Sequence, residues 1–424
     1  MASQSIQSLE LKEQDASVRE YIGKTLVTLV HGLALPPPEA HLSLSVKRRA
    51  NSTSCIINPI TGALEASPRV ETTRTYSWPA KTAYEEWKFS MTCTDTALLY
   101  SLTCLYSGHS SNSGYLGPGH SDGTAHLQKV NRDIYYIDPE FFRAQYVVDG
   151  VIDDLAYTIG VDREALSVVC ILKTRTPQDQ TAHIHTINQE AAGKGLVAGN
   201  FRLIRASRVV VVAQSATEDT LIPRIENADE IEISRVRWVL VIEKEAVFHR
   251  LARTAYHTRA TAGEGLLVTG KGYPDLSTRL FLRKLFDLAS NRIVPLRFYA
   301  LTDGDPHGIA ITSTYKYGSA AHSHENARLS IPRLQWLGLR VSDIITVPEV
   351  LGDKALLSLT GRDRKKIISM LHNSPVWASD GPELQWRVEL QRMLFLNAKA
   401  EIEILYECSG GLEGWIERRM FRQE

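Results

Sequence analysis

RWVLVIEKEAVFHRL, residues 237–251, decides the fold of the second half of the chain. It opens with the apolar run WVLVI, which is typical of a strand buried on both faces of a sheet. Apolar side chains at helical spacing follow in KEAVFHRL. The stretch therefore predicts a strand that leads directly into a helix.

The same order of strand and helix recurs farther along the chain. GLLVTG (265–270) predicts a second strand and LSTRLFLRKLFDLA (276–289) a second helix. VPLRFYALTDGD (294–305) predicts a third strand, and a helix follows Pro306. Strands that alternate with helices predict an α/β fold with a parallel, doubly wound sheet. In such sheets ligands bind beyond the carboxyl ends of the strands.

Three carboxylates stand at these strand ends. Glu243 ends the first strand, and Asp303 and Asp305 end the third, two positions apart. Because residues i and i+2 of an extended segment point to the same side, both aspartates can face one point. Carboxylates gathered around one point repel each other, and hard oxygen ligands of this kind suit Mg²⁺. A pair of solvated turn aspartates is the alternative, since DGD is common in turns.

The string RDIYY (132–136) places a basic residue before two adjacent tyrosines. On a strand Tyr135 and Tyr136 point in opposite directions, so only one of them can face a given partner. A phenol is a feasible phosphoryl nucleophile once its proton is removed. Arg132 is close enough in sequence to bind the phosphate or to stabilise developing charge. One packed and one exposed aromatic side chain is the alternative interpretation.

Lys194 and Lys271 each stand in a GKG tripeptide. Such loops let the backbone approach a phosphate closely and present a point charge. Tyr273 could stack on a sugar or a base, and Arg279, on the following helix, is a candidate phosphate contact. Ordinary surface turns, a tyrosine that caps the sheet and a solvated helix face are the alternatives.

The composition is that of a folded protein with more than one domain. Of the 424 residues, 43% are hydrophobic and 23% are charged, and the formal net charge is zero. Any basic face must therefore be local. The five cysteines form no CxxC pair, which disfavours a zinc knuckle or a disulfide framework. The N-terminus lacks a signal-peptide pattern, and no apolar run is long enough to span a bilayer. We expect a soluble intracellular protein.

The N-terminal part has a different organisation. Residues 8–33 predict an amphipathic helix, residues 35–80 a long loop or irregular arm, and residues 82–106 a further helix. The stretch SGHSSNSGYLGPGHSDG (107–123) is of low complexity and predicts disorder.

Regular structure is predicted again from Asp138, where an acidic cap and a proline favour a helix to about residue 159. VDREAL (161–166) predicts a short second helix and LSVVCIL (166–172) a strand. Helix, short helix and strand is the order of a winged-helix unit. Farther on, GKGLVAGN (193–200) predicts a turn and RLIRASRVVVVA (202–213) a strand.

Together these segments resemble the meiotic double-strand-break transesterase, the eukaryotic relative of the topoisomerase VI A subunit. The resemblance covers roughly residues 130–424, with the segments in matching order and approximate spacing. The strings that carry it are RDIYYIDPEFFRAQYVVDGVIDDLAYTIGV (132–161), GKGLVAGN (193–200), VIEKEAVFHRL (241–251), VTGKGYPDLSTRLFLRKL (268–285) and LTDGDPHGIAI (301–311), with weaker support from YKYGS (315–319), IPRLQWLGL (331–339) and KAEIEIL (399–405).

We expect a mixed α/β chain with three regions. The sequence pattern of residues 1–80 predicts an N-terminal helix and an irregular arm, and the resemblance implies the two regions that follow. Residues 81–215 are expected to form a winged-helix domain that carries the nucleophile, with low-complexity insertions near 107–126 and 170–190. Residues 216–424 are expected to form a Toprim domain that binds the metal, with a C-terminal helical extension.

The resemblance also implies a reaction. In the family the second aromatic position of the RDIYY motif is the nucleophile, which selects Tyr136, and Arg132 falls on an assisting arginine. The phenolate attacks a backbone phosphate of double-stranded DNA and leaves a 5′-phosphotyrosyl link and a free 3′-hydroxyl. Such a break initiates meiotic recombination.

Metal and DNA contacts follow from the same likeness. Glu243, Asp303 and Asp305 fall on the carboxylates that bind Mg²⁺, and Lys194 and Tyr273 fall on positions that contact DNA. The metal would hold the phosphate and stabilise developing charge.

The family implies a homodimer whose composite sites take the tyrosine from one protomer and the metal from its partner. It also implies a topoisomerase VI B-type subunit, meiotic accessory proteins, and action on chromosomes in the nucleus, with no membrane partner. The chain has no GxxxxGK[ST] motif for ATP, so ATP hydrolysis is not assigned to it. Two alternatives stay open: a DNA-binding scaffold of the same fold that does not cleave, and a Toprim nuclease or primase that does not use Tyr136.

Two stretches depart from the family pattern. SMTCTDTALLYSLTCLYSGHSSNSGYLGPGH (90–120) stands where a long aliphatic helix is expected, and an insertion lies near 170–190. We hypothesise that both are translated intron sequence. Detection of peptides spanning 107–126 or 174–190 in the native protein by mass spectrometry would contradict this hypothesis.

Overall fold

The computed structural model divides into two compact units, residues 1–49 with 71–191 and residues 50–70 with 192–424, each of which is described by itself. The predicted helix over 82–106 and the stretches 107–123 and 170–190 lie outside the described residues. The structure describes residues 2–34, 42–47, 55–67, 73–78, 129–130, 140, 143–161, 166, 168–169, 194–205, 208–213, 220–223, 225, 229–289, 295–345 and 356–422.

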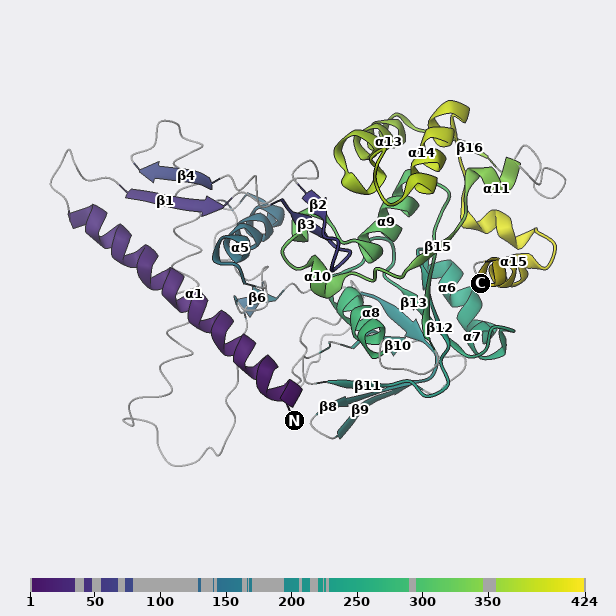
Figure 1. The fold of residues 1–424 in the computed structure, drawn as a ribbon, viewed down its shortest axis with the longest axis horizontal. Coiled ribbons are helices and arrows are strands. Elements are labelled where there is room, and N and C mark those ends of the chain that lie inside the picture. The colour runs from purple at the N-terminus through teal and green to yellow at the C-terminus, as the bar shows by residue number, and fades with distance from the viewer. Residues whose placement is uncertain are drawn as a thin grey trace. The chain divides into compact units, whose positions relative to one another are not determined.

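The described elements of the first unit are α1 (Ala2–Ala34), β1 (Leu42–Lys47), β4 (Thr73–Trp78), β5 (Lys129–Val130), α5 (Gln145–Ile159) and β6 (Val168–Val169). Helix α1 confirms the helix predicted over residues 8–33 and extends it at its N-terminus (Figure 1). Val18 and Ile22 of α1 share a core with Val151 and Leu155 of α5. Each pair is four residues apart, the spacing that forms one apolar helix face.

The sequence predicts an irregular arm over residues 35–80, but part of this segment forms β-strands. Strands β1 and β4 pair antiparallel over their whole lengths. Leu44 and Val46 are buried, while Ser43 and Ser45 beside them are exposed. This strand thus alternates with period two, but serine at the outward positions makes the pattern easy to mistake for a loop.

The helix predicted from Asp138 is interrupted: Glu140 is helical, but α5 begins only at Gln145. Arg143 has a left-handed φ of 62° and Ala144 is extended with φ −156°, conformations that interrupt an α-helix. The helix ends at Gly160, whose φ of 80° forms a left-handed cap. Strand β6 lies within the strand predicted over 166–172 and pairs parallel with β5.

The second unit is built on a six-stranded mixed sheet in the order β10-β7-β13-β12-β14-β15. Strands β13, β12, β14 and β15 are parallel to one another. The sequence predicts the first three of these strands but not β15. Strands β7 and β10 are antiparallel to their neighbours, and β7 uses residues that had been predicted to be a turn. The strands are β7 (Leu196–Ala198), β10 (Thr220–Leu221), β12 (Trp238–Ile242), β13 (Gly265–Thr269), β14 (Arg297–Leu301) and β15 (Gln335–Gly338).

Helices cover both faces of this sheet (Figure 1). Leu240 and Ile242 of β12 pack in one core with α6 (Glu245–Arg253), α7 (Tyr256–Arg259) and α15 (Gly411–Arg422). Val239 and Val241 pack in the other core with α8 (Leu276–Ala289) and α9 (Pro306–Lys316). Each fully buried aliphatic side chain contributes about 1.5–3 kcal/mol, which explains why this strand is apolar at every position.

Two smaller β-structures belong to the same unit. The strand predicted over 202–213 is two antiparallel strands, β8 (Phe201–Arg205) and β9 (Arg208–Ala213), joined in a three-stranded sheet by β11 (Glu230–Glu232). The hairpin of β2 (Cys55–Ile57) and β3 (Leu64–Ala66) comes from the N-terminal region. It docks through the Leu64 amide, which donates to the Tyr317 carbonyl at 2.7 Å.

The last part of the second unit is largely helical. Its β16 and β17 pair antiparallel. No helix in the described part of the chain is both long and apolar enough to cross a membrane. The remaining elements are η3 (Ala320–His322), α10 (Asn326–Leu329), α11 (Val341–Ile345), β16 (Leu357–Ser358), α13 (Gly361–Asn373), η5 (Pro375–Trp377), α14 (Leu384–Leu396), β17 (Ala398–Lys399) and η6 (Ile402–Tyr406).

Candidate functional site

The predicted acidic residues meet at the carboxyl edge of the parallel strands. Glu243 follows β12 and Asp303 follows β14 by two residues. These strands are direct neighbours, and the Glu243 amide extends their ladder by donating to the Leu301 carbonyl at 3.1 Å. The Asp303 amide in turn donates to Oε2 of Glu243 at 2.9 Å. Strand pairing therefore brings together two carboxylates that are 60 residues apart.

Burial and mutual repulsion disfavour the charged forms of these carboxylates. Burial, followed by the charge of Asp303, raises the pKa of Glu243 to about 8. Burial also raises the pKa of Asp303 to about 6, although the Ile402 amide and Lys244 oppose this shift. The charge of Asp305 raises the pKa of both groups further. The edge thus holds more negative charge than its own residues compensate.

Lys244 is a cationic partner that the sequence did not single out. Its Nζ lies 3.1 Å from Oδ2 of Asp303, 2.6 Å from Glu403 and 3.4 Å from Glu401. Burial lowers the pKa of Lys244, but its bonds to Glu403 and Asp303 outweigh burial and raise it. The ammonium group is thereby kept charged among these carboxylates.

A backbone bridge brings the segment KAEIE (399–403) to the site. Gly304 and Ala400 exchange amide-to-carbonyl bonds at 2.8 and 3.0 Å. The Ile402 amide then donates to Oδ1 of Asp303 at 2.9 Å. Glu401 and Glu403, two residues apart in this segment, flank Lys244. The charged residues at every second position of this segment are the sequence pattern that could have identified Glu401 and Glu403.

Asp305, at the same edge of the sheet, stabilises the start of a helix. It is the N-cap of α9, and its Oδ1 accepts from the Gly308 amide at 2.7 Å. An aspartate cap followed by proline at the first helical turn is a favoured helix start. Asp305 thus also starts a helix and is half-buried, whereas Asp303 is buried with 7% exposure.

The donor chemistry at this edge fits a hard divalent cation. Glu243, Asp303 and Asp305 offer carboxylate oxygens, and their uncompensated charge is what a cation would neutralise. Among the described residues, however, no three Asp, Glu, His or Cys side chains are grouped in the manner of a metal site. One oxygen of Asp305 caps the helix, and its charge still raises the pKa of both Glu243 and Asp303.

The two GKG loops lie beside each other. Nζ of Lys194 is 3.5 Å from the carbonyl of Lys271, and Lys271 forms an ion pair with Glu245 at 2.9 Å. Tyr273 is 42% exposed. Its hydroxyl accepts from Lys366 of α13 at 3.0 Å, so an exposed aromatic face and a cation stand together here.

Arg279 does not lie on a solvated helix face, and its burial argues against a phosphate contact. The side chain is 2% exposed and donates to Oδ1 of Asn326 at 3.1 Å. Burial lowers its pKa to about 10. Arg279 therefore joins α8 to α10 rather than offering a charge to solvent. Arg132 and Tyr136 lie outside the described residues.

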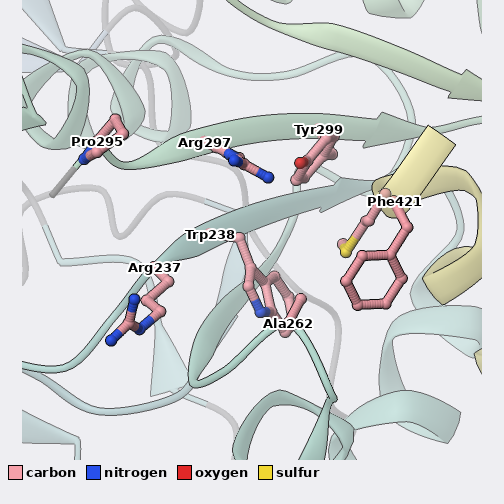
Figure 2. Close-up of a pocket in the computed structure, with 8 residues that line it drawn as sticks. Arg237, Trp238, Ala262, Pro295, Arg297, Tyr299 and Phe421 are labelled. Carbon is pink, nitrogen blue, oxygen red and sulfur yellow. The ribbon is translucent and has the colours of Figure 1, made fainter. Parts of the chain in front are cut away.

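A pocket of about 180 Å³ lies at the opposite edge of the sheet, where the strands begin. Figure 2 shows Arg237 and Arg297 at the amino ends of β12 and β14, with Trp238, Tyr299 and Phe421 nearby. Because these strands are parallel, the pocket is separated from Glu243 and Asp303 by the strand length. It forms no part of the acidic site.

Comparison with protein families matches two parts of the chain. Residues 238–411 match the Toprim domain of the family that comprises Spo11 and the A subunit of topoisomerase 6. Residues 127–168 match the type IIB DNA topoisomerase family. The first range contains the acidic edge, and the second contains Arg132 and Tyr136.

Curated relatives agree with these matches. The meiotic recombination protein SPO11 of Homo sapiens is 33% identical over 65% of this chain, and the match spans 61% of the human protein. The meiotic recombination protein rec12 of Schizosaccharomyces pombe is 36% identical over 67% of this chain and 70% of its own length. In Arabidopsis thaliana, the A subunit of DNA topoisomerase 6 is 31% identical over 66% of this chain and 57% of its own length. The chain therefore belongs to the family of SPO11 and rec12 meiotic recombination proteins and topoisomerase 6 A subunits.

Proposed function

We propose that this protein breaks both strands of duplex DNA by transesterification and so initiates meiotic recombination. Membership of the family supports the reaction class. The observation that carries the proposal is the pair of buried, mutually repelling carboxylates, Glu243 and Asp303, at the carboxyl edge of the Toprim sheet. Ligands of such sheets bind at this edge.

Tyr136 is the proposed nucleophile, on a winged-helix domain. Its phenolic oxygen attacks a backbone phosphorus, the bond from phosphorus to the 3′ oxygen breaks, and that oxygen takes up a proton. The products are a 5′-phosphotyrosyl link and a free 3′-hydroxyl. Arg132 is proposed to bind the attacked phosphate and to stabilise its developing charge.

Glu243, Asp303 and Asp305 would hold Mg²⁺, the cation that suits carboxylate oxygens and phosphate. The metal would supply charge neutralisation at the phosphate. Lys244 would balance Asp303, Glu401 and Glu403, the carboxylates that it contacts. Lys194, Lys271 and Tyr273 are proposed to contact the DNA backbone beside the acidic edge.

The proposed working form is a homodimer on chromosomes in the nucleus. Each site would combine the tyrosine of one protomer with the acidic edge of its partner, and the two sites would cut one strand each. The proposed further partners are meiotic accessory proteins and a B-type ATPase subunit. These assignments follow the family relationship rather than contacts within this chain.

Tyr136→Phe tests the chemistry because it removes only the phenolic oxygen. We expect loss of the covalent protein–DNA adduct on denaturing gels with Mg²⁺, while DNA binding is retained. Cleavage that persists in this variant would favour a Toprim nuclease or primase. An unmodified protein that binds DNA but forms no adduct with its partners present would favour a non-cleaving scaffold.

A further inference from the structure

Asp275 follows the second GKG loop in sequence, and its carboxylate joins the first GKG loop to the start of α8. Oδ2 accepts from the backbone amide of Lys194 at 2.6 Å, and Oδ1 accepts from the amide of Thr278 at 2.7 Å. The second bond caps the first turn of α8, as aspartate does at helix starts. The first bond reaches across 81 residues of sequence. One side chain thus fixes a loop and a helix to each other.

Packing beneath the loops leaves them little freedom. A Cβ built on Gly195 would lie 2.3 Å from Oγ1 of Thr278, and one built on Gly270 would lie 2.5 Å from the Tyr315 hydroxyl. Only glycine fits at either place. Both loops therefore rest directly on α8 and α9.

Lys271, in the second loop, is also held in place. Its φ of 54° is left-handed, its amide donates to Oγ1 of Thr269 at 3.1 Å, and its Nζ pairs with Glu245. The charge of Asp275 also opposes the fall in the pKa of Lys194 that burial causes. The two lysine loops therefore lie side by side, and Asp275 fixes the backbone of the first of them to the start of α8.

We propose that Asp275 is a positioning residue for DNA binding: it holds Lys194 beside the 271–273 loop so that both contact one stretch of phosphodiester backbone. The inference rests on the proposed function for the identity of the ligand. It assigns a favourable role in binding a polyanion to a negatively charged residue that does not itself touch DNA. Simple charge repulsion would predict the opposite effect of removing this carboxylate.

Asp275→Asn separates these possibilities. Asparagine keeps an oxygen for the Thr278 amide and is a good helix cap, but its NH₂ group cannot accept from the Lys194 amide. Binding is measured to duplex DNA by the full-length chain with its partners, in the Tyr136→Phe background, over a range of salt concentrations. We expect DNA affinity to fall roughly five-fold, with the salt slope reduced by about one unit. Asp275→Ser keeps the cap and should behave similarly.

Asp287→Asn is the matched control, because Asp287 is an exposed carboxylate on the same helix that pairs with Arg283 at 2.9 Å. It removes the same charge and should leave the affinity unchanged or slightly higher. Combining Asp275→Asn with Lys194→Met should weaken binding no more than Lys194→Met alone. Unchanged affinity and salt slope in both folded Asp275 variants would overturn the proposal, as would fully additive effects in the double variant. Since cleavage is not measured, failure of the tyrosine mechanism leaves this test intact.

Discussion

At the scale of single residues, Glu243 and Asp303 make the stability of the metal-free chain depend on pH. The pKa of Glu243 rises from 4.5 to about 8 and the pKa of Asp303 from 3.8 to about 6 on folding. Between about pH 4 and about pH 8 the folded state therefore holds more protons than the unfolded state. The free energy of unfolding falls as pH rises through this range. With a chelator present, we expect the melting temperature to decrease from about pH 5 to about pH 8, measured by calorimetry.

Glu243→Gln is the control for this titration. An amide carries no charge, so the pH dependence should flatten, and the variant should melt higher than the native chain at about pH 8 with a chelator. It should also lose stabilisation by added Mg²⁺, because a ligand that binds only the folded state raises its stability. An unchanged pH profile in this variant would show that the slope arises elsewhere.

Lys244 would compete with a metal ion for Asp303, the one proposed metal ligand to which it is paired. Lys244→Met removes the charge of the side chain and keeps an unbranched stem, so repulsion among Asp303, Glu401 and Glu403 should increase. We expect lower stability with a chelator at about pH 8 and tighter Mg²⁺ binding, by thermal melts across a magnesium titration. Weaker Mg²⁺ binding in a folded variant would instead indicate that Lys244 helps to organise the ligands.

The sequence predicts site residues that stand next to a recognisable strand, but it does not predict those whose partners are distant in sequence. Glu243 and Asp303 stand directly after apolar strands, so their meeting follows from strand pairing. Two of the partners of Lys244, Glu401 and Glu403, are 157 and 159 residues away in sequence, and no local pattern reports such contacts. Arg279 was misjudged because helical spacing cannot show that Asn326 lies opposite its side chain.

At the scale of elements, Asn326 joins the β2–β3 hairpin to the rest of the second unit. Its Nδ2 donates to the carbonyls of Leu64 at 2.6 Å and Ser319 at 2.7 Å, and its Oδ1 accepts from Arg279 and from the Ser319 amide. Asn326 is fully buried. Its removal would leave several buried polar groups without partners, which is costly.

Asn326→Ala should therefore lower the free energy of unfolding by about 2–3 kcal/mol, measured by urea denaturation. Hydrogen exchange should accelerate in residues 55–66 before it does in β12. Asn373→Ala is the comparison, because the Asn373 side chain donates to Ser369 at an exposed position, and its effect should stay within about 0.5 kcal/mol. Equal effects of the two substitutions would argue against the docking role.

The sequence predicts elements correctly where apolar residues keep one spacing over a long stretch. It misses short strands that form only by pairing with a neighbouring strand. Helix α8 has the bounds that its apolar spacing predicts. The three residues of β7 had been interpreted as a turn between glycines, yet they pair with β13 and are buried. A strand this short has too few residues to reveal its period, and pairing with its neighbours β10 and β13 stabilises it.

At the scale of the whole molecule, the parallel half of the sheet followed from the alternation of strands and helices. The division into units did not, because the chain enters the second unit at residues 50–70 and returns to the first. Such a crossing depends on tertiary contacts, among them the bond from Leu64 to Tyr317. Three chain connections therefore join the unit that contains Tyr136 to the one that contains the acidic edge.

The proposed dimer makes a prediction that depends on which protomer supplies each part. When Tyr136→Phe and Asp303→Asn chains are mixed, a mixed dimer with composite sites has one site that lacks both groups and one that is intact. We expect either variant alone to be inactive and the mixture to nick one strand, leaving a single 5′-linked adduct on the Asp303→Asn chain. If the two chains carry different tags, denaturing gels show which chain is covalently bound to DNA. If each site instead used the tyrosine and acids of the same chain, every site in the mixture would lack one group, and no adduct would form.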